Sequence, residues 1–121
     1  SPADTLTFTT WWNEVETVAR TEAHSSVFRR QTLTIVFNVV DGSCQVSLAG
    51  DSKAYLLPCV EDPRRGKLEC WDFFVGASIP ILGRNVTLKQ ASVSTQHWVE
   101  FHAKRLQTVL KALEMELVKY N

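Results

Sequence analysis

The chain has 121 residues, the length of one domain whose core can bury about two-thirds of the unfolded chain's surface. Its 13 basic and 13 acidic residues give a formal net charge of zero, which argues against broad electrostatic attraction to nucleic acid or to an anionic membrane. No apolar run approaches the ~20 residues of a membrane-spanning helix, and the first residues lack the pattern of a signal peptide.

The three cysteines, Cys44, Cys59 and Cys70, are odd in number and show no CxxC spacing. This pattern argues against a disulfide framework and a zinc site, and it is typical of a reducing, intracellular compartment. Cys44 lies in an alternating, strand-like run, which predicts a small buried side chain. Because the sequence begins at Ser1 rather than at a methionine, we expect residues 1–121 to be one domain excised from a longer protein.

Alternating apolar residues predict several strands in the first half of the chain. We expect these strands at residues 6–12, 30–40, 43–48 and 53–60. The dipeptide Asp41-Gly42 is a strong hairpin signal between the second and the third of them. Residues 13–26 are polar, with two internal valines, and we expect them to form a loop.

Turn signals continue through the middle of the chain. Residues 61–67 are predicted to form a charged loop. Two short strands, residues 78–82 and 86–91, should meet at a tight reversal in which Gly83 and Asn85 suit left-handed backbone. Pro80 cannot donate a ladder hydrogen bond, so its strand is expected either to lie at a sheet edge or to be interrupted there.

The last quarter of the chain changes to helical periodicity. Either Ser92 or Ser94 can cap the helix, which could run ~25 residues and nearly 40 Å. The apolar positions at helical spacing are Trp98, Phe101, His102, Leu106, Val109, Leu110, Leu113, Leu117 and Tyr120. The sequence therefore predicts a mainly β domain, an antiparallel β sandwich or barrel capped by one long C-terminal α-helix.

The end of this helix, from about Leu110, is expected to extend past the sheet with an apolar stripe that needs cover. We expect a monomer in which the stripe packs on the predicted loop through Val15 and Val18. The alternative is a dimer in which Leu110, Leu113 and Leu117 form a seam with the same helix of a second chain.

Three residues have a structural interpretation. Asp72 is expected to cap a turn by accepting hydrogen bonds from backbone N–H groups, and Gly76 and Gly83 are expected to supply positive φ angles. Arg84 should lie at the tip of a reversal, as either a solvated side chain or a contact to a partner's carboxylate.

Candidate partner-binding residues fall in two other places. Arg64, Arg65 and Lys67 form the densest basic cluster, which is either a solvated loop or a contact to an acidic protein surface. Trp11 and Trp12 are adjacent in a strand and must point to opposite faces, so one is expected in the core and the other is either covered or an interface anchor.

Other aromatic and catalytic residue types give a plainer result. Trp71 and Trp98 are both expected in the core, and His97 and His102 are about 140° apart on a helix, so they cannot share a metal ion. The sequence contains no recognisable arrangement for nucleophilic, acid–base or phosphoryl-transfer chemistry. We therefore expect no enzyme activity, no catalytic residue, no cofactor and no metal.

The order of these elements resembles the DM-ten domain, a pleckstrin-homology-like module of EF-hand-containing axonemal proteins and of a cilia-associated nucleoside diphosphate kinase. The resemblance covers residues 5–102, leaves the helix extension at 103–121 outside, and departs from the family's acidic pattern at residues 13–14 and 90–94. The matching residues are Asp72-Phe73-Phe74-Val75-Gly76-Ala77, Ile79, Ile81, Arg84 and Leu88, and upstream residues 29–37, Asp41-Gly42-Ser43, Leu6-Thr7-Phe8 and Trp11-Trp12.

The resemblance implies a non-catalytic protein-interaction or scaffolding module of a ciliary, flagellar or centriolar cytoskeletal protein. Its location would be the cytoplasm, at the axoneme or basal body, and its partner would be tubulin or another axonemal or centriolar scaffold protein. A first alternative is a regulatory or targeting module attached to a nucleoside diphosphate kinase or a protein kinase. A second is a phosphoinositide-binding domain, which needs basic residues such as Arg20, Arg29 and Arg30 to converge at one open end of the sandwich.

Overall fold

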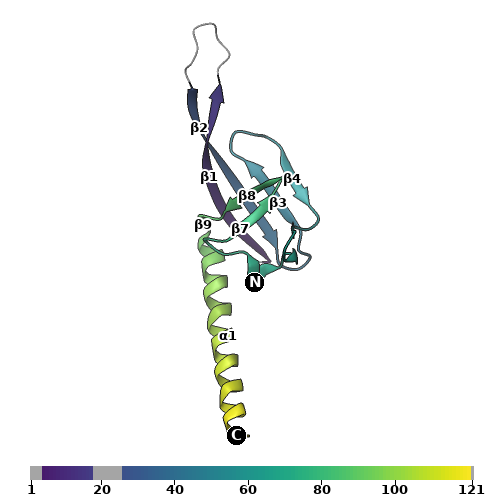
Figure 1. Ribbon diagram of the computed structural model, residues 1–121, viewed down its shortest axis with the longest axis vertical. Coiled ribbons are helices and arrows are strands. Elements are labelled where there is room, and N and C mark those ends of the chain that lie inside the picture. Colours follow the sequence, from purple (N-terminus) through teal and green to yellow (C-terminus); the bar gives the residue numbers. More distant parts are fainter. Residues whose placement is uncertain (1–3, 18–25, 121) are drawn as a thin grey trace.

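A computed structural model describes residues 4–17 and 26–120, with the side chains of residues 4–14 and 29–120. It confirms a mainly β domain with a single C-terminal helix among these residues (Figure 1). Five antiparallel strands form one sheet in the order β4-β3-β2-β1-β9. Their bounds are β1 (Thr5–Thr17), β2 (Ser26–Asn38), β3 (Cys44–Leu48), β4 (Ala54–Leu57) and β9 (Gln90–Ala91).

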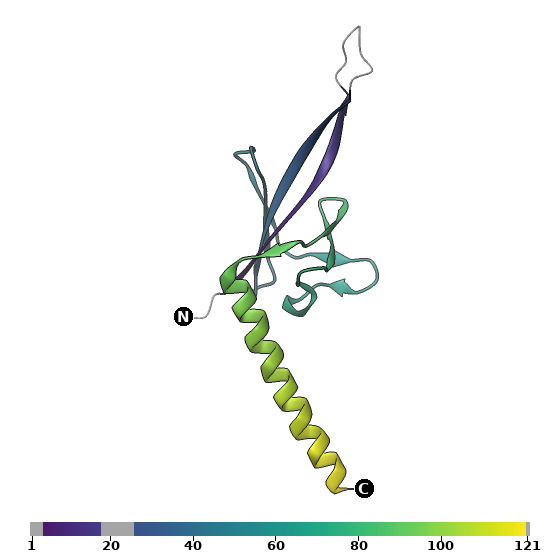
Figure 2. The ribbon, with the colours of Figure 1, turned by 90° about the vertical axis from the view of Figure 1, so that its left-hand side faces the viewer.

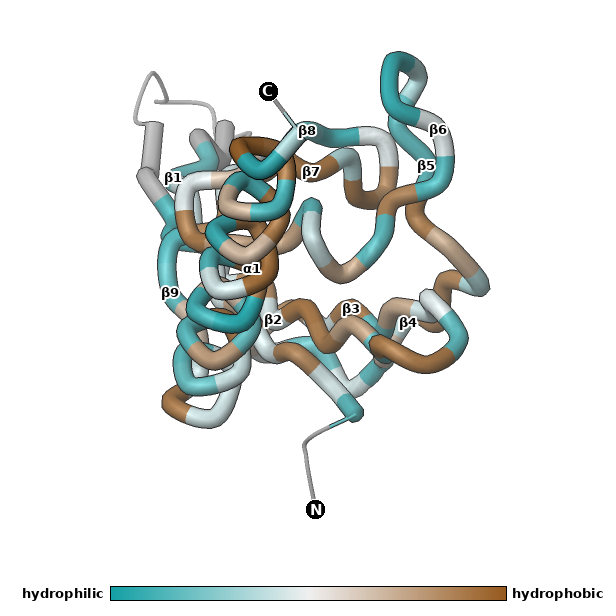
Figure 3. Tube along the Cα trace, turned by 90° about the horizontal axis from the view of Figure 1, so that it is seen from below, coloured by the Kyte–Doolittle hydropathy of each residue, from teal (hydrophilic) through white to brown (hydrophobic). Residues whose placement is uncertain are grey.

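Two small hairpins and a short 3-10 helix make the second layer. β5 (Glu61–Asp62) pairs with β6 (Gly66–Lys67), and β7 (Ser78–Ile81) pairs with β8 (Arg84–Thr87). The 3-10 helix Cys70–Asp72 connects these hairpins. Seen along the helix axis, this layer and the five-stranded sheet lie on opposite sides of the core (Figure 3).

The core lies between the two layers and follows the predicted alternation. Phe73 of the second layer stacks on Phe37 of the sheet, with ring centroids 4.3 Å apart. Cys44 is fully buried as predicted, and burial raises the pKa of its thiol to about 11. The buried apolar residues are Leu6, Phe8, Leu33, Ile35, Phe37, Cys44, Val46, Val60, Leu68, Phe73, Ala77, Ile79, Ile81, Val86 and Leu88.

The predicted loop at residues 13–26 is wrong at residues 13–17 and at Ser26, which belong to strands. β1 continues to Thr17 and pairs with β2 from Ser26 onward, so that a long two-stranded ribbon projects from the sandwich (Figures 1 and 2). A ribbon with no layer over it needs no apolar face, and the register places Glu14 opposite Arg29, a favourable pairing of opposite charges. Residues 18–25, which include Val18 and Arg20, lie outside the described residues.

Two of the predicted connections need correction. The residues 61–67 form the β5–β6 hairpin rather than a loop. The β7–β8 reversal is a two-residue turn, Leu82-Gly83, in which Leu82 has φ +49° and Gly83 has φ +77°. Asn85 instead lies in β8 and pairs with Pro80, whose strand is an edge strand as predicted. The hairpin turn at Asp41-Gly42 is confirmed, with φ +77° at the glycine.

The long helix is confirmed as α1 (Val93–Lys119), 27 residues in length. Ser92 caps it, because its side-chain oxygen accepts a hydrogen bond from the Thr95 N–H at 3.2 Å. The buried Thr95 hydroxyl in turn accepts from the Thr7 N–H at 2.8 Å, which fastens the first turn of the helix to β1. From Ala103 onward every described helical residue is exposed, and the helix projects away from the sandwich (Figure 2).

Candidate partner-binding surfaces

Trp12 and Arg84 contact each other at the base of the ribbon, and Glu14 contacts both side chains. The Arg84 guanidinium lies 4.6 Å from the centroid of the Trp12 ring and 3.5 Å from the Glu14 carboxylate. The Trp12 indole N–H also donates to Glu14 at 3.0 Å. The prediction that Arg84 lies at the tip of the reversal is therefore wrong. Leu82 occupies the tip, and the Arg84 guanidinium is held against the Trp12 ring.

Trp11 lies on the other face of β1, as predicted for adjacent residues of a strand. Trp12 packs against the core, whereas Trp11 is half-buried between two cations. The Arg30 guanidinium lies 4.6 Å and the Lys89 ammonium 5.1 Å from the Trp11 ring centroid. Lys89 also donates to the Trp11 carbonyl at 2.6 Å. We call Trp11, Arg30 and Lys89 the Trp11 surface.

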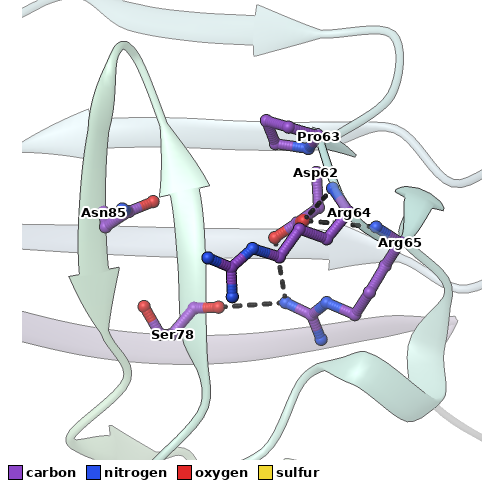
Figure 4. Close-up of a pocket in the computed structure, with 6 residues that line it drawn as sticks. All are labelled: Asp62, Pro63, Arg64, Arg65, Ser78 and Asn85. Atoms are coloured by element: carbon purple, nitrogen blue, oxygen red, sulfur yellow. Dashed lines mark hydrogen bonds and ion pairs between the residues drawn. The ribbon is translucent and has the colours of Figure 1, made fainter.

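The basic cluster at β5–β6 divides into residues with different surroundings. Arg65 contacts Asp62 at 3.3 Å and Asp72 at 3.5 Å, and it donates to the Ser78 carbonyl at 3.1 Å (Figure 4). Arg65 therefore ties the β5–β6 hairpin to the 3-10 helix and to β7. The backbone N–H of Arg64, followed by the Arg65 guanidinium, holds the pKa of Asp62 below its ordinary value.

The side chains of Arg64 and Lys67 point in directions different from that of Arg65. The Arg64 side chain points toward Ser78 and Asn85 across an open depression of about 620 Å³ (Figure 4). Lys67 lies over the β2–β3 turn, where its Cε atom would be 3.3 Å from a Cβ added at Gly42. The three basic residues of the predicted cluster therefore do not form one convergent site.

Two of the structural predictions for the second layer are confirmed. Asp72 accepts a hydrogen bond from the Glu69 N–H at 2.8 Å and so caps the start of the 3-10 helix. Gly76 has φ +99°, and its N–H donates to the Leu88 carbonyl at 2.7 Å, which joins the turn to the end of β8.

An aromatic cluster at the base of α1 was only partly expected. Trp98 is half-buried against the core, but Trp71 is 53% exposed, so its predicted core position is wrong. The Trp71 and Trp98 centroids are 5.8 Å apart, and His102 lies 4.2 Å from Trp98 and 5.9 Å from Trp71.

This cluster forms one side of an apolar groove of about 240 Å³, which we call the basal groove. Its apolar side chains come from both the second layer and the first turns of the helix. The lining residues are Cys70, Trp71, Phe73, Phe74, Trp98, Val99, His102, Ala103 and Leu106.

The projecting part of α1 carries an uncovered apolar stripe. The predicted packing of this stripe on residues 13–26 is wrong, because the described ends of the ribbon and of the helix lie at opposite ends of the molecule (Figure 1). The exposed apolar residues of this part are Leu106, Val109, Leu110, Leu113, Met115, Leu117, Val118 and Tyr120.

Other kinds of site have little support in residues 4–17 and 26–120. No group of three or more His, Cys, Asp and Glu side chains in this part of the chain is arranged to hold a metal ion. No helix within it is long and apolar enough to cross a membrane. All three cysteines are free thiols.

Comparison with known proteins found neither a matching family model nor a curated protein of significantly similar sequence.

Proposed function

We propose that this chain is a non-catalytic protein-interaction module. The observation that carries the proposal is the apolar stripe along α1, which no described part of the chain covers. A folded domain seldom leaves a long apolar surface in water unless that surface associates with another protein. The helix presents this stripe on an arm that is separate from the sandwich (Figure 2).

The cellular context of the proposal comes from the resemblance described above. A pleckstrin-homology-like module of this family would act in a ciliary, flagellar or centriolar scaffold, and its partner would be tubulin or another cytoskeletal scaffold protein. The sandwich with one C-terminal helix is compatible with that fold.

The Trp11 surface is the best candidate for contact with such a partner. Tubulin has an acidic exterior, and Arg30 and Lys89 place two cations beside one half-buried tryptophan. Tryptophan and arginine are the residue types that most often dominate the energy of a protein interface. Arg65 and Arg84 are less suitable, since each already pairs with a carboxylate of this chain.

Co-sedimentation of the 121-residue chain with microtubules tests this function. We expect the chain to pellet with microtubules at low salt and less at high salt. Lys89→Glu should reduce binding about tenfold or more, because it places a like charge against the partner. Lys53→Glu makes the same change in net charge at an exposed position before β4 and should bind as the parent does. Equal binding by both variants would exclude the Trp11 surface as the contact site. No binding at low salt would exclude tubulin as the partner.

A further inference from the structure

We infer that two copies of this chain associate through their α1 helices in antiparallel orientation, with the end of each helix in the basal groove of the other copy. The inference deepens the proposed interaction function, because it names the occupant of the apolar stripe. It stands on three observations: the spacing of the apolar residues of α1, the order of its charges, and the position of the basal groove.

The apolar residues of the arm contain a continuous seam. Six of them are separated by steps of three and four residues in strict alternation, the pattern of a helix that packs lengthwise on another helix. At 1.5 Å per residue the seam is about 26 Å long. Its members are Ala103, Leu106, Leu110, Leu113, Leu117 and Tyr120.

The charges of the arm favour the antiparallel orientation. Residues 103–111 of α1 carry three cations, Lys104, Arg105 and Lys111, and no acid, whereas residues 112–119 carry Glu114, Glu116 and Lys119, of which Lys119 contacts Glu116 at 3.1 Å. Antiparallel pairing places the positive segment of each helix beside the segment of the other helix that has a net negative charge. Parallel pairing in register would place like charges side by side along the same length, which is unfavourable.

The antiparallel register also matches side chains by size. When Leu110 lies opposite Leu113 of the second copy, Leu106 lies opposite Leu117, and the small Ala103 lies opposite the large Tyr120. Each of these layers occurs twice because the pair is symmetric. Tyr120, the side chain that fills the space above Ala103, thus comes from the far end of the other helix.

The basal groove lies where this register needs it. Ala103 and Leu106 are both seam residues and lining residues of the groove, together with the exposed ring of Trp71. Leu117 and Tyr120 of the second copy therefore reach the groove at both ends of the helix pair. In a parallel pair the same residues would lie at the far end from both grooves, and the grooves would remain open to water.

The resulting dimer would hold its two sandwiches at opposite ends of the helix pair. Each would present its own Trp11 surface, so the dimer could contact two sites of a repeating partner such as a microtubule. Two linked sites increase the apparent affinity without any new contact.

Sedimentation equilibrium tests the dimer and its seam. We expect the 121-residue chain to be a dimer and the Leu113→Glu variant to be a monomer with an unchanged circular dichroism spectrum of the sandwich. Met115→Glu is the matched control, because Met115 is 64% and Leu113 is 55% exposed, yet Met115 lies off the seam. A parent chain that is monomeric at all concentrations, or equal behaviour of the two variants, overturns the inference.

Trp71→Ala tests the basal groove separately. The ring is exposed in the single copy, so its loss should leave the fold intact and weaken the dimer about tenfold or more. Unchanged dimer affinity would overturn the placement of the helix end in the groove.

Disulfide formation tests the orientation in a Cys59→Ser, Cys70→Ser background. An Ala103→Cys protein mixed with a Tyr120→Cys protein should form a mixed disulfide, while neither should cross-link alone, because like positions would be about 26 Å apart along the axis. Cross-linking of each protein with itself would overturn the antiparallel orientation.

Microtubule binding by the Leu113→Glu monomer separates this inference from the proposed function. Weaker binding than that of the dimer supports the inference. A parent chain that pellets with microtubules but never dimerises overturns the inference alone, and a dimer that does not pellet overturns only the choice of partner.

Discussion

The sandwich and the helical arm of this chain use apolar residues in opposite ways. All fifteen apolar residues that are buried in the described part of the chain belong to the sandwich or to its connections, and none belongs to α1. The arm nevertheless has leucine or valine at most of its repeating positions. The sandwich therefore has a buried core of its own, whereas no described part of the chain covers the apolar residues of the arm.

The two regions also differ in what stabilises them. Each described strand of the sandwich pairs with a neighbour, and β1, β2, β3, β7 and β8 also bury apolar residues, so the sandwich is stabilised by contacts distant in sequence. The described residues of the arm from Ala103 onward are all exposed, and helices with little tertiary packing are marginal in water. We expect the arm to gain most of its order when a partner covers the seam.

The largest test of this contrast compares two phenylalanines. Phe73→Ala removes a fully buried ring that stacks on Phe37, and it should lower the free energy of unfolding by about 3–5 kcal/mol. Phe101→Ala removes a ring on α1 that is 63% exposed and should change it by less than about 0.5 kcal/mol. Urea denaturation followed by circular dichroism measures both. Similar losses for the two variants would mean that α1 packs on the sandwich at Phe101.

The sequence predicted the sandwich well because burial imposes a period of two. The alternation around Phe37 and Cys44 identified the core face, and the stripe from Leu106 to Leu117 gave the helix nearly its full length. Each of these patterns is local and depends only on which side of one element is apolar.

The errors arose where structure depends on a distant partner or on strain. Residues 13–17 continue a strand without a burial pattern, because the ribbon is paired but uncovered. Leu82 takes a left-handed conformation that leucine rarely adopts, so the turn was placed one residue late. Trp71 looked like a core residue, but its ring lies beside Trp98 and His102 at the base of α1 and is 53% exposed.

The basal groove and the pairing of Arg65 could not be predicted for the same reason. Arg65 contacts Asp62, Asp72 and Ser78, which lie in three different elements. The groove joins a 3-10 helix to a helical face about 30 residues later in the chain. A single sequence contains the residue types of such sites but not the distances between them.

The second test uses the buried thiol of Cys44 to ask how dry the core is. Its pKa is raised from 9.0 to about 11 by burial, so the folded state keeps its proton while the unfolded state loses it. The unfolded state therefore binds fewer protons between pH 9 and about 11, and stability should fall as pH rises through this window. Urea midpoints at pH 8 and at intermediate values up to 11 measure the effect.

Cys44→Ala is the control for that titration, because lysines and tyrosines also ionise in alkali. The variant should start less stable, since it leaves a small cavity, but its stability should fall less steeply above pH 9. Parallel decreases for the two proteins would show that the thiol does not contribute and that water reaches this part of the core.

The smallest effect is expected at Gly76, in the turn that joins the second layer to the end of β8. Its φ of +99° is unfavourable for any residue with a Cβ, although a Cβ there would meet no atom within 4 Å. Gly76→Ala should therefore lower the free energy of unfolding on the order of 1 kcal/mol through backbone strain alone. The neighbouring Val75→Ala, at a side chain that is 54% exposed, should change it by less than about 0.5 kcal/mol. Thermal melts of the Leu113→Glu background would measure the sandwich without the contribution of dimerisation. A melting midpoint for Gly76→Ala that equals or exceeds that of its parent would contradict this expectation. It would show that the backbone of the turn can change its φ angle without loss of stability, so that this edge of the sandwich does not constrain its conformation.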